Sequence, residues 1–285
     1  MGYRLVTFAS SKGPRAGVVA DDMVYDAGAD IVELLNKKIK PRGKATPLRK
    51  VKLLAPIPRP GAIYCAGANY TDHVAEMERA QGREPGPTMK DLGEKPWHFI
   101  KASHCVVGPN ATVRLPSFSR AVDWEVELVA VIARKAKDVP VGKALGCVGG
   151  YTIANDLSAR DVMRRPNNPP ASPFHFDWLS QKSFDGACPL GPWIVPAAEI
   201  GDAHDLGIKL WVGDELMQDS NTGRMIFDTA EQIAMLSSRV TLWPGDLVLT
   251  GTPAGVGMGR KRFLRSGERV RLWIEKIGEL RHKVA

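Results

Sequence analysis

The chain has 285 residues, of which 44% are hydrophobic and 25% are charged, a composition typical of a globular protein with one large domain or a large and a small one. No apolar run approaches the roughly 18 residues needed to span a bilayer, and the first residues lack the layout of a signal peptide. The four cysteines form no CxxC pair, which argues against a zinc site and against a disulfide framework. We therefore predict a cytoplasmic protein without a membrane partner.

The net charge of +8 is unevenly distributed along the chain. Much of the excess lies in residues 36–52, NKKIKPRGKATPLRKVK, where no aromatic side chains interleave for base stacking. This pattern favours a solvated basic surface, so no nucleic-acid partner is predicted. The positive charge can still steer small dianions toward a pocket at moderate salt.

The first 55 residues predict a small α+β unit. Three short strands are expected at 3–9, 15–20 and 23–28. Residues 30–39 then carry apolar side chains at helical spacing, with Asp30 as a candidate N-cap. The segment APIPRPG at 55–61 has three prolines in seven residues and is the strongest linker. We therefore predict a small N-terminal domain at 1–55 and a larger domain at 56–285.

Beyond the linker the pattern is mostly β. Strand-like runs separated by Gly and Pro turns stand at 62–67, 98–102, 111–115, 125–133, 146–156, 191–196, 208–213, 246–253 and 269–275. Helical spacing is clearest at 227–238, where Asp228 can cap the helix. The predicted fold class is therefore mixed and mostly β.

The stretch DWEVEL at 123–128 places two carboxylates at the entrance of a buried strand. Because side chains alternate along a strand, Glu125 and Glu127 share one face and lie roughly 7 Å apart. Two anions there repel each other unless a cation lies between them. A wetted edge strand would also give this spacing, but residues 129–133 are apolar on both faces, which places the pair at the edge of a core.

A third carboxylate is expected at Asp156. It ends the strand-like run GYTIAND, and Ser158 to Asp161 has the form of a capping box that opens a helix. Asp156 can be a simple turn residue, yet a strand end beside a helix start also presents side chains to ligands. Three hard oxygen donors without nearby Cys or His indicate magnesium, manganese or calcium.

Five segments in order resemble the fumarylacetoacetate hydrolase superfamily. They are GANYTDHVAEM (67–77), DWEVEL (123–128), GYTIANDLSARD (150–161), KSFDGACPLGPW (182–193) and LTGTPAGVG (249–257). The resemblance covers about residues 55–285. It implies a β-roll core, usually in a homodimer, that binds Mg²⁺ or Mn²⁺ through Glu125, Glu127 and Asp156, with a variable N-terminal domain.

The resemblance also assigns roles to the segment TDHVAEMERA. The family's catalytic pair would fall on His73 and Glu76, which lie three apart on a predicted helical turn, so that Glu76 can orient the imidazole for proton transfer from water. Outside the family context, such a pair is usually an exposed surface pair.

Three other positions are candidates for contact with the substrate or with the leaving enolate. Lys182 matches a family lysine that faces the substrate and can stabilise an enolate. Thr252, with adjacent backbone N–H groups, can hold a carboxylate. Arg160 and Lys101 are further substrate-contact candidates, and either can instead be a structural ion-pair partner.

These assignments imply a divalent-metal-dependent hydrolase that cleaves the C3–C4 bond of a 2,4-dioxo acid, an anionic acylpyruvate or fumarylpyruvate-like substrate. The alternatives are decarboxylation of an oxaloacetate-like acid, isomerisation of an unsaturated 2-oxo diacid in aromatic catabolism, and an inactive metal-binding protein that serves a partner. Ala68, where some acylpyruvate hydrolases carry Arg, and the Pro-rich loop 164–181 depart from the family pattern and affect substrate choice.

Overall fold

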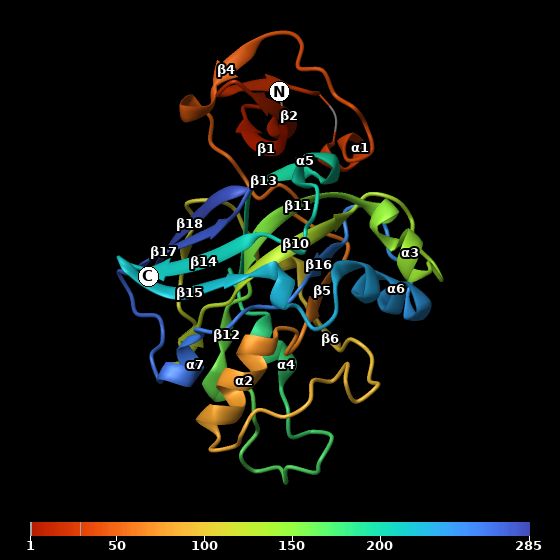
Figure 1. The fold of residues 1–285 in the computed structure, drawn as a ribbon. Coiled ribbons are helices and arrows are strands. Elements are labelled where there is room, and N and C mark those ends of the chain that lie inside the picture. The colour runs from red at the N-terminus through yellow and green to blue at the C-terminus, as the bar shows by residue number, and fades with distance from the viewer. Residues whose placement is uncertain (1, 29) are drawn as a thin grey trace.

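One long mixed sheet takes strands from both parts of the chain in the computed structural model, which describes residues 2–28 and 30–285 (Figure 1). Its N-terminal strands, in the order β4-β3-β2-β1, are β1 (Arg4–Ser10), β2 (Gly13–Ala20), β3 (Met23–Asp26) and β4 (Ala45–Pro47). The three strands predicted in this unit are therefore confirmed. Strand β1 also pairs with β13 (Cys188–Pro196), where Leu5 lies opposite Ile194.

The helix predicted at 30–39 is much shorter than expected. Helix α1 covers only Ile31–Leu34, and the Asp30 side chain caps it by accepting a hydrogen bond from the backbone N–H of Val32. Two features oppose its extension: three lysines crowd into residues 37–40, and Pro41 disfavours helical backbone in the residue before it.

The body of the protein contains the rest of the long sheet and a second sheet packed against it. The first continues through β13 (Cys188–Pro196), β11 (Val148–Asn155), β10 (Val126–Ile132), β16 (Leu247–Leu249), β5 (Ile63–Ala66) and β6 (His98–Lys101), with β7 (Val106–Val107) beside β13. The second has the order β15 (Glu215–Asn221), β14 (Gly207–Val212), β17 (Arg269–Ile274), β18 (Gly278–Val284) and β8 (Thr112–Val113). Strands β13, β11 and β10 face β18, β17 and β14, and the main core lies between them. The predicted mostly β architecture is therefore confirmed.

The helices are short and lie around the sheets. They are α2 (Thr71–Ala80), α3 (Val141–Ala144), α4 (Trp178–Lys182), α5 (Ala197–Ile200), α6 (Thr229–Arg239) and α7 (Gly257–Arg260). Helix α6 has the predicted Asp228 cap, reinforced by Glu231. None of the helices in the described residues combines the length and apolar character that a membrane span requires.

The capping box predicted at Ser158 to Asp161 is wrong. Ser158 and Ala159 form β12, which pairs with β9 (Val122–Asp123), and only a single 3-10 turn follows. The Ser158 hydroxyl donates to the carbonyl of Asp156, and Asp161 instead accepts hydrogen bonds from Ser119 and from the backbone of Arg120. Pairing with β9 satisfies this backbone, so a helix start is not needed.

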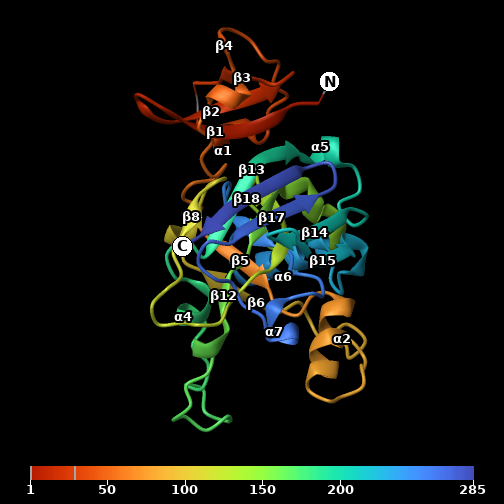
Figure 2. The ribbon, with the colours of Figure 1, turned by 90° about the vertical axis from the view of Figure 1, so that its left-hand side faces the viewer.

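The N-terminal unit and the helices α2, α4 and α7 lie at opposite ends of the molecule (Figures 1 and 2). The candidate site residues come from the end that contains these helices and β12. The four cysteines are buried and free.

Candidate active site

Three buried carboxylates meet where β10 begins and β11 ends. Glu127 lies in β10, Glu125 directly precedes this strand, and Asp156 directly follows β11. The antiparallel register places Val126 opposite Asn155, and the Asp156 N–H donates to the Glu125 carbonyl over 2.9 Å. One carboxylate oxygen from each of the three residues lies within 4.8 Å of the others. The structure thus brings the three predicted metal ligands together in one group, the carboxylate cluster.

Two lysines neutralise part of this cluster. The Lys182 ammonium, at the end of α4, lies 2.8 Å from Glu125 Oε2 and 2.6 Å from Asp156 Oδ2. The Lys101 ammonium, from β6, lies 2.6 Å from Asp156 Oδ1 and also donates to the Leu157 carbonyl. Lys101 is fully buried, and the charge of Asp156 raises its pKa although burial alone would lower it.

Arg160 supplies a third cation. Its guanidinium lies 2.9 Å from Asp123 Oδ2 and also contacts the Glu125 carboxylate. Asp123 in turn accepts backbone hydrogen bonds from Gly257 and Met258 at the start of α7. Arg160 thereby ties the loop before β10 to α7, and of the two roles left open for it the ion pair is the one seen in this structure.

The two glutamates have opposite electrostatic environments. Burial alone would raise the pKa of Glu125, but Lys182 and Arg160 hold it well below its usual range. For Glu127, burial and the negative charges of Asp156 and Glu125 raise the pKa well above its usual range. The cluster therefore carries negative charge that the protein's own cations do not fully balance.

A hard divalent cation fits this donor set. The cluster offers three carboxylate oxygens close together, no thiolate or imidazole among them, and an unfavourable charge on Glu127 that a cation would relieve. The Lys182 ammonium bridges Glu125 and Asp156, so a metal ion would compete with it for these two carboxylates.

His73 and Glu76 lie on α2, as predicted, and face the same region. The distance from His73 Nδ1 to Glu76 Oε2 is 3.7 Å, which is longer than a hydrogen bond, and Nδ1 is buried without another partner. Glu76 accepts hydrogen bonds from the backbone N–H of Gly255. Burial would raise the pKa of Glu76, but His73 and this N–H lower it, so Glu76 is a carboxylate held beside the imidazole.

A cavity of about 190 Å³ adjoins the cluster and the histidine. Its polar walls come from Glu125, Glu127, His73, Arg160, Gln181, Lys182 and Thr252, and its apolar walls come from Trp97, Phe99, Met163 and Trp178 with residues 66–68. Lys101 is not part of this wall. The lysine and histidine predicted to act on a substrate therefore line one cavity together with two of the candidate metal ligands.

Thr252 lies in the cavity wall, but its hydroxyl already has partners. It donates to the Val126 carbonyl and accepts a hydrogen bond from Gln218, both over 2.9 Å. The neighbouring N–H of Gly251 donates to Glu127 Oε2 over 2.7 Å. In this structure the segment at 251–252 thus supports the carboxylate cluster, and its role in holding a substrate carboxylate stays a prediction.

Two residues that the sequence analysis did not name support Glu125. The Asn155 Oδ1 accepts the backbone N–H of Glu125, and the Asn155 Nδ2 faces His282 Nε2 at 2.9 Å. Because an N–H group can only donate, the Asn155 amide orientation follows, and His282 Nε2 must accept. Burial lowers the pKa of His282 to about 4, in agreement with a neutral ring. The sequence NDLS indicates a turn that begins at Asn155, but nothing in it indicates contact with the distant His282.

Comparisons with known proteins identify the family to which the chain belongs. Residues 62–285 match the family model described as fumarylacetoacetate (FAA) hydrolase C-terminal, and residues 3–56 match one described as Rv2993c-like, N-terminal. Because the first match covers most of the chain, the protein belongs to the fumarylacetoacetate hydrolase family. The division of the chain at residue 55 stays a proposal.

The relatives include enzymes with different names. Oxaloacetate tautomerase Fahd2a, mitochondrial, from Rattus norvegicus is 42% identical over 240 residues, which are 84% of this chain and 71% of the relative. Among solved structures, 2-hydroxyhepta-2,4-diene-1,7-dioate isomerase from Mycobacterium marinum has a TM-score of 0.79 and 32% identity over 99% of this chain and 98% of that one. Fumarylacetoacetate hydrolase (EaFAH) from Exiguobacterium antarcticum has a TM-score of 0.80 and 31% identity over 99% of each chain. The fold and the family are thus established, while the cytoplasmic location stays a prediction.

Proposed function

We propose that the protein is a metal-dependent enzyme that moves protons on a small 2-oxo acid, and that keto–enol interconversion of oxaloacetate is its best-supported reaction. The observation that carries this proposal is the convergence of the carboxylate cluster, Lys182 and His73 on one cavity. The cavity volume of about 190 Å³ is below the roughly 300–1,000 Å³ of drug-sized sites, which suits a compact acid. The name of the 42% identical relative supports the same substrate.

Glu125, Glu127 and Asp156 would hold the divalent cation. A bound Mg²⁺ or Mn²⁺ acts as a Lewis acid that polarises a carbonyl group and so acidifies the neighbouring carbon. The protein's contribution is to keep these carboxylates in place, through the Asn155 side chain at Glu125 and the Gly251 N–H at Glu127.

Lys182 and Arg160 supply fixed positive charge to the cavity. Both side chains are largely buried and line the cavity, so their charges act where little water screens them. Negative charge develops on the 2-oxo oxygen when a proton leaves C3. An ammonium at that position stabilises the enolate more than the starting ketone, which lowers the barrier.

His73 is the proposed proton carrier. With Nδ1 turned toward Glu76, the ring presents Nε2 as the basic atom. In the tautomerase reaction Nε2 takes a proton from C3, and a proton is returned to the 2-oxo oxygen, so that the ketone becomes the enol. Glu76 stabilises the imidazolium that exists between these two transfers.

The second candidate is the hydrolysis first predicted, the cleavage of a 2,4-dioxo acid. It is favoured by the His73–Glu76 pair, which can take a proton from water as well as from carbon, and by the likeness to a solved fumarylacetoacetate hydrolase. The hydroxide attacks the C4 carbonyl, the C3–C4 bond breaks, and pyruvate leaves as its enolate together with a free acid. Decarboxylation or isomerisation of a 2-oxo diacid uses the same enolate without water.

One substrate panel separates these reactions. The Mg²⁺ and Mn²⁺ forms are mixed with oxaloacetate, acylpyruvates and unsaturated 2-oxo diacids, and the products are followed by NMR in deuterated water. Catalysed enol formation with exchange at C3 and no loss of carbon indicates a tautomerase. Pyruvate with a free acid indicates a hydrolase, and carbon dioxide indicates a decarboxylase. Absence of turnover with every substrate would favour an inactive metal-binding protein that serves a partner.

The metal assignment has its own test. Glu127→Ala should weaken magnesium binding measured by calorimetry, because it removes one of three oxygen ligands. Oxalate should bind competitively with substrate only when metal is present. Magnesium affinity equal to that of the parent would contradict the assignment.

The His73–Glu76 pair can be tested by rates on two reactions. His73→Ala or Glu76→Gln should lower acylpyruvate hydrolysis by about 10² to 10⁴ fold, the usual range for a positioned general base. Decarboxylation of oxaloacetate needs no attacking water and should fall less, whereas Glu125→Ala should abolish both. Hydrolysis at the parent rate in His73→Ala would return His73 to the status of a partly exposed helix residue.

A homodimer is also proposed. The aromatic rings of Trp97 and Trp178 lie 5.0 Å apart beside the cavity, and Trp97, Phe176 and Leu179 are about half exposed or more. An apolar group of this kind favours contact with a second protein surface. Sedimentation equilibrium measures the association directly, and a monomer at micromolar concentration would contradict it.

A further inference from the structure

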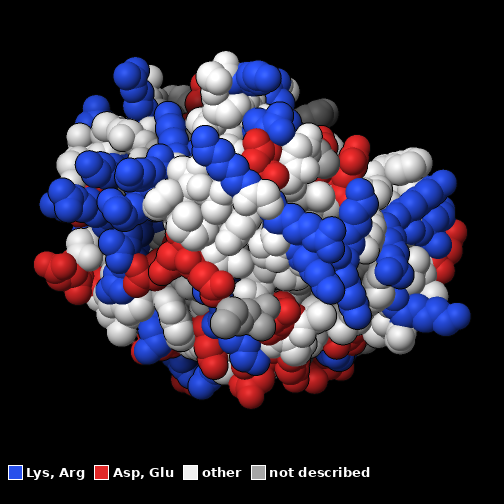
Figure 3. All heavy atoms as spheres, turned by 90° about the horizontal axis from the view of Figure 1, so that it is seen from above, with Lys and Arg blue, Asp and Glu red and all other residues white. Residues whose placement is uncertain are grey.

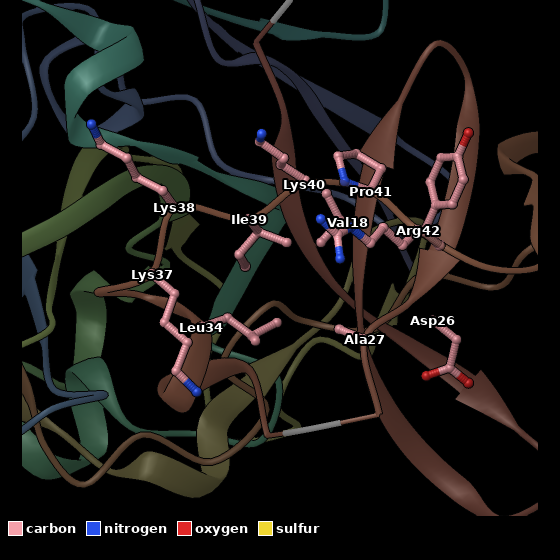
Figure 4. Close-up of a pocket in the computed structure, with 11 residues that line it drawn as sticks. Val18, Asp26, Ala27, Leu34, Lys37, Lys38, Ile39, Lys40, Pro41 and Arg42 are labelled. Atoms are coloured by element: carbon pink, nitrogen blue, oxygen red, sulfur yellow. The ribbon is translucent and has the colours of Figure 1, made fainter.

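A second hollow lies in the N-terminal unit, far from the carboxylate cluster. It has a volume of about 530 Å³, within the range of small-molecule sites. It is lined by residues of β2 and β3 on one side and by Leu34 and residues 37–42 on the other (Figure 4). The reaction proposed above uses none of these residues.

The lining combines an apolar floor with a basic rim. Val18 and Leu34 are buried beneath the hollow, and Ala27, Ile39 and Pro41 extend this apolar surface, with Tyr25 at its side. The rim carries Lys37, Lys38, Lys40 and Arg42. In Figure 4 the Arg42 side chain reaches across toward Val18 and Ile39, so one guanidinium lies over the apolar floor.

The rim cations have no ion-pair partner among the described residues. None of these four side chains forms an ion pair or a hydrogen bond with another described residue. Asp26 is the one acidic residue in the lining, and its carboxylate is engaged by Arg15 Nε at 2.7 Å and by the Gly28 N–H. Residues 36–52 contain eight Lys and Arg and no acid, which equals the net charge of the whole chain. Lys and Arg side chains also dominate this end of the molecule in Figure 3.

The segment that carries the rim is fixed at its start. The Asn36 amide donates to the Ala133 carbonyl and accepts from Arg134 Nε at 3.2 Å, and the Tyr3 hydroxyl donates to the Lys37 carbonyl over 3.0 Å. Leu35 is buried in the main core. The segment that carries the rim is thus anchored at its start to the body of the protein.

We propose that this hollow binds a small molecule that combines a multivalent anionic group, of the diphosphate or triphosphate class, with a flat apolar group, as a nucleoside polyphosphate does. Arg42 and the lysines attract the phosphates, because unpaired guanidinium and ammonium groups lose no internal partner on binding. The apolar group packs against the partly exposed side chains of Tyr25, Ile39 and Pro41. The absence of aromatic residues interleaved along 36–52 favours a small ligand over a nucleic-acid strand.

Calorimetry on the metal-free protein tests the proposal with ATP, inorganic triphosphate and adenosine as probes. Metal-free conditions prevent phosphates from binding through a cation at the carboxylate cluster. ATP should bind saturably, with triphosphate weaker and adenosine weaker still. Arg42→Gln should lower the affinity for ATP at least tenfold. The matched control is Arg49→Gln, which removes one exposed charge from the same basic tract outside the hollow and should change the affinity less than twofold.

Four results would overturn the proposal. Equal losses in Arg42→Gln and Arg49→Gln would show that only diffuse charge attracts the anion. Triphosphate binding as tightly as ATP would remove the role of the apolar floor. Absence of saturable ATP binding at millimolar concentration, or tighter binding of a single-stranded oligonucleotide, would exclude a small-molecule site of this kind. Circular dichroism on both variants confirms that the exposed substitutions leave the fold intact.

Discussion

Two groups of cations lie at opposite ends of the molecule and differ in what neutralises them. In the active site, Lys101, Lys182 and Arg160 are buried or nearly so, and each contacts at least one carboxylate. In the N-terminal tract 36–52, the Lys and Arg side chains are exposed and have no ion-pair partner among the described residues. The same residue types thus serve as fixed structural charges at one end and as free charges at the other.

The difference follows from solvation. A buried ammonium or guanidinium loses its water and needs a carboxylate partner, whereas an exposed one keeps its water and needs none. With Asp123, Glu125, Glu127 and Asp156 all ionised, the three cations of the active site would leave one negative charge unbalanced, and the raised pKa of Glu127 reflects the cost of that charge. A divalent cation would make the site net positive, as an anionic substrate requires. The basic tract can attract anions without any such ion.

The largest expected effect is a loss of turnover, which removal of an active-site cation should cause and removal of a cation from the basic tract should not. Lys182→Met removes the ammonium from the cavity and should lower turnover by about 10² to 10³ fold, the usual cost of one lost transition-state donor. Lys50→Met, in the basic tract and outside both cavities, should leave turnover within twofold at moderate salt. The measurement is the steady-state rate with metal at saturation. Equal rates for parent and Lys182→Met would show that the buried cation serves the fold alone.

The next effect compares how much a buried and an exposed ion pair contribute to the free energy of unfolding. Asp156→Asn leaves the buried Lys101 ammonium without a carboxylate, and the free energy of unfolding should fall by about 3–5 kcal/mol. Asp26→Asn breaks the solvent-exposed pair with Arg15 and should lower the free energy of unfolding far less, because water screens this pair. Urea denaturation of the metal-free proteins measures both, because Asp156 is also a candidate metal ligand. Similar losses in the two variants would contradict the distinction drawn between the two ends.

The sequence predicted those elements whose burial leaves a strong local pattern. Strand β10 is apolar on both faces, and Asp228 with Glu231 marks the start of α6. Strands β15 and β18 were not predicted because only some of their side chains are buried and the rest are polar, so no apolar run distinguishes them from loops. Helix α1 was predicted to be too long because the helical spacing of apolar residues does not report the charge repulsion among the lysines that follow.

The candidate site could likewise be predicted only where its residues follow a local sequence pattern. Glu125 and Glu127 could be paired from strand alternation alone, and Asp156 from its place at a strand end. Their ion partners could not be found in this way, because Lys101 and Lys182 reach Asp156 from elements 55 and 26 residues away. The link from Asn155 to His282 spans 127 residues and depends on which strands of the two sheets face each other. Such pairings are properties of the packed structure.

The smallest expected effect is a pH dependence that arises near the site and not in the basic tract. Burial lowers the pKa of His282 from 6.5 to about 4, so below pH 6.5 the unfolded chain binds a proton that the folded protein does not. The stability from this residue is complete above pH 6.5 and is lost as the pH falls toward 4. A loss of about 2 kcal/mol between pH 8 and pH 5 is expected from this linkage.

His282→Gln tests this assignment, because glutamine can accept from Asn155 but does not titrate. Urea denaturation at pH 8, 6.5 and 5 measures the free energy of unfolding. Its loss between pH 8 and pH 5, the pH slope, should be smaller than in the parent by about the same 2 kcal/mol. The residual slope is then due to other groups, among them His98, whose pKa burial also lowers to about 4. Lys38→Gln, in the basic tract, should leave this pH dependence unchanged. If His282→Gln retains the full pH slope, the His282 ring is not the buried neutral acceptor that holds Asn155 against Glu125. The support of the carboxylate cluster must then come from the Gly251 N–H and the ion pairs alone.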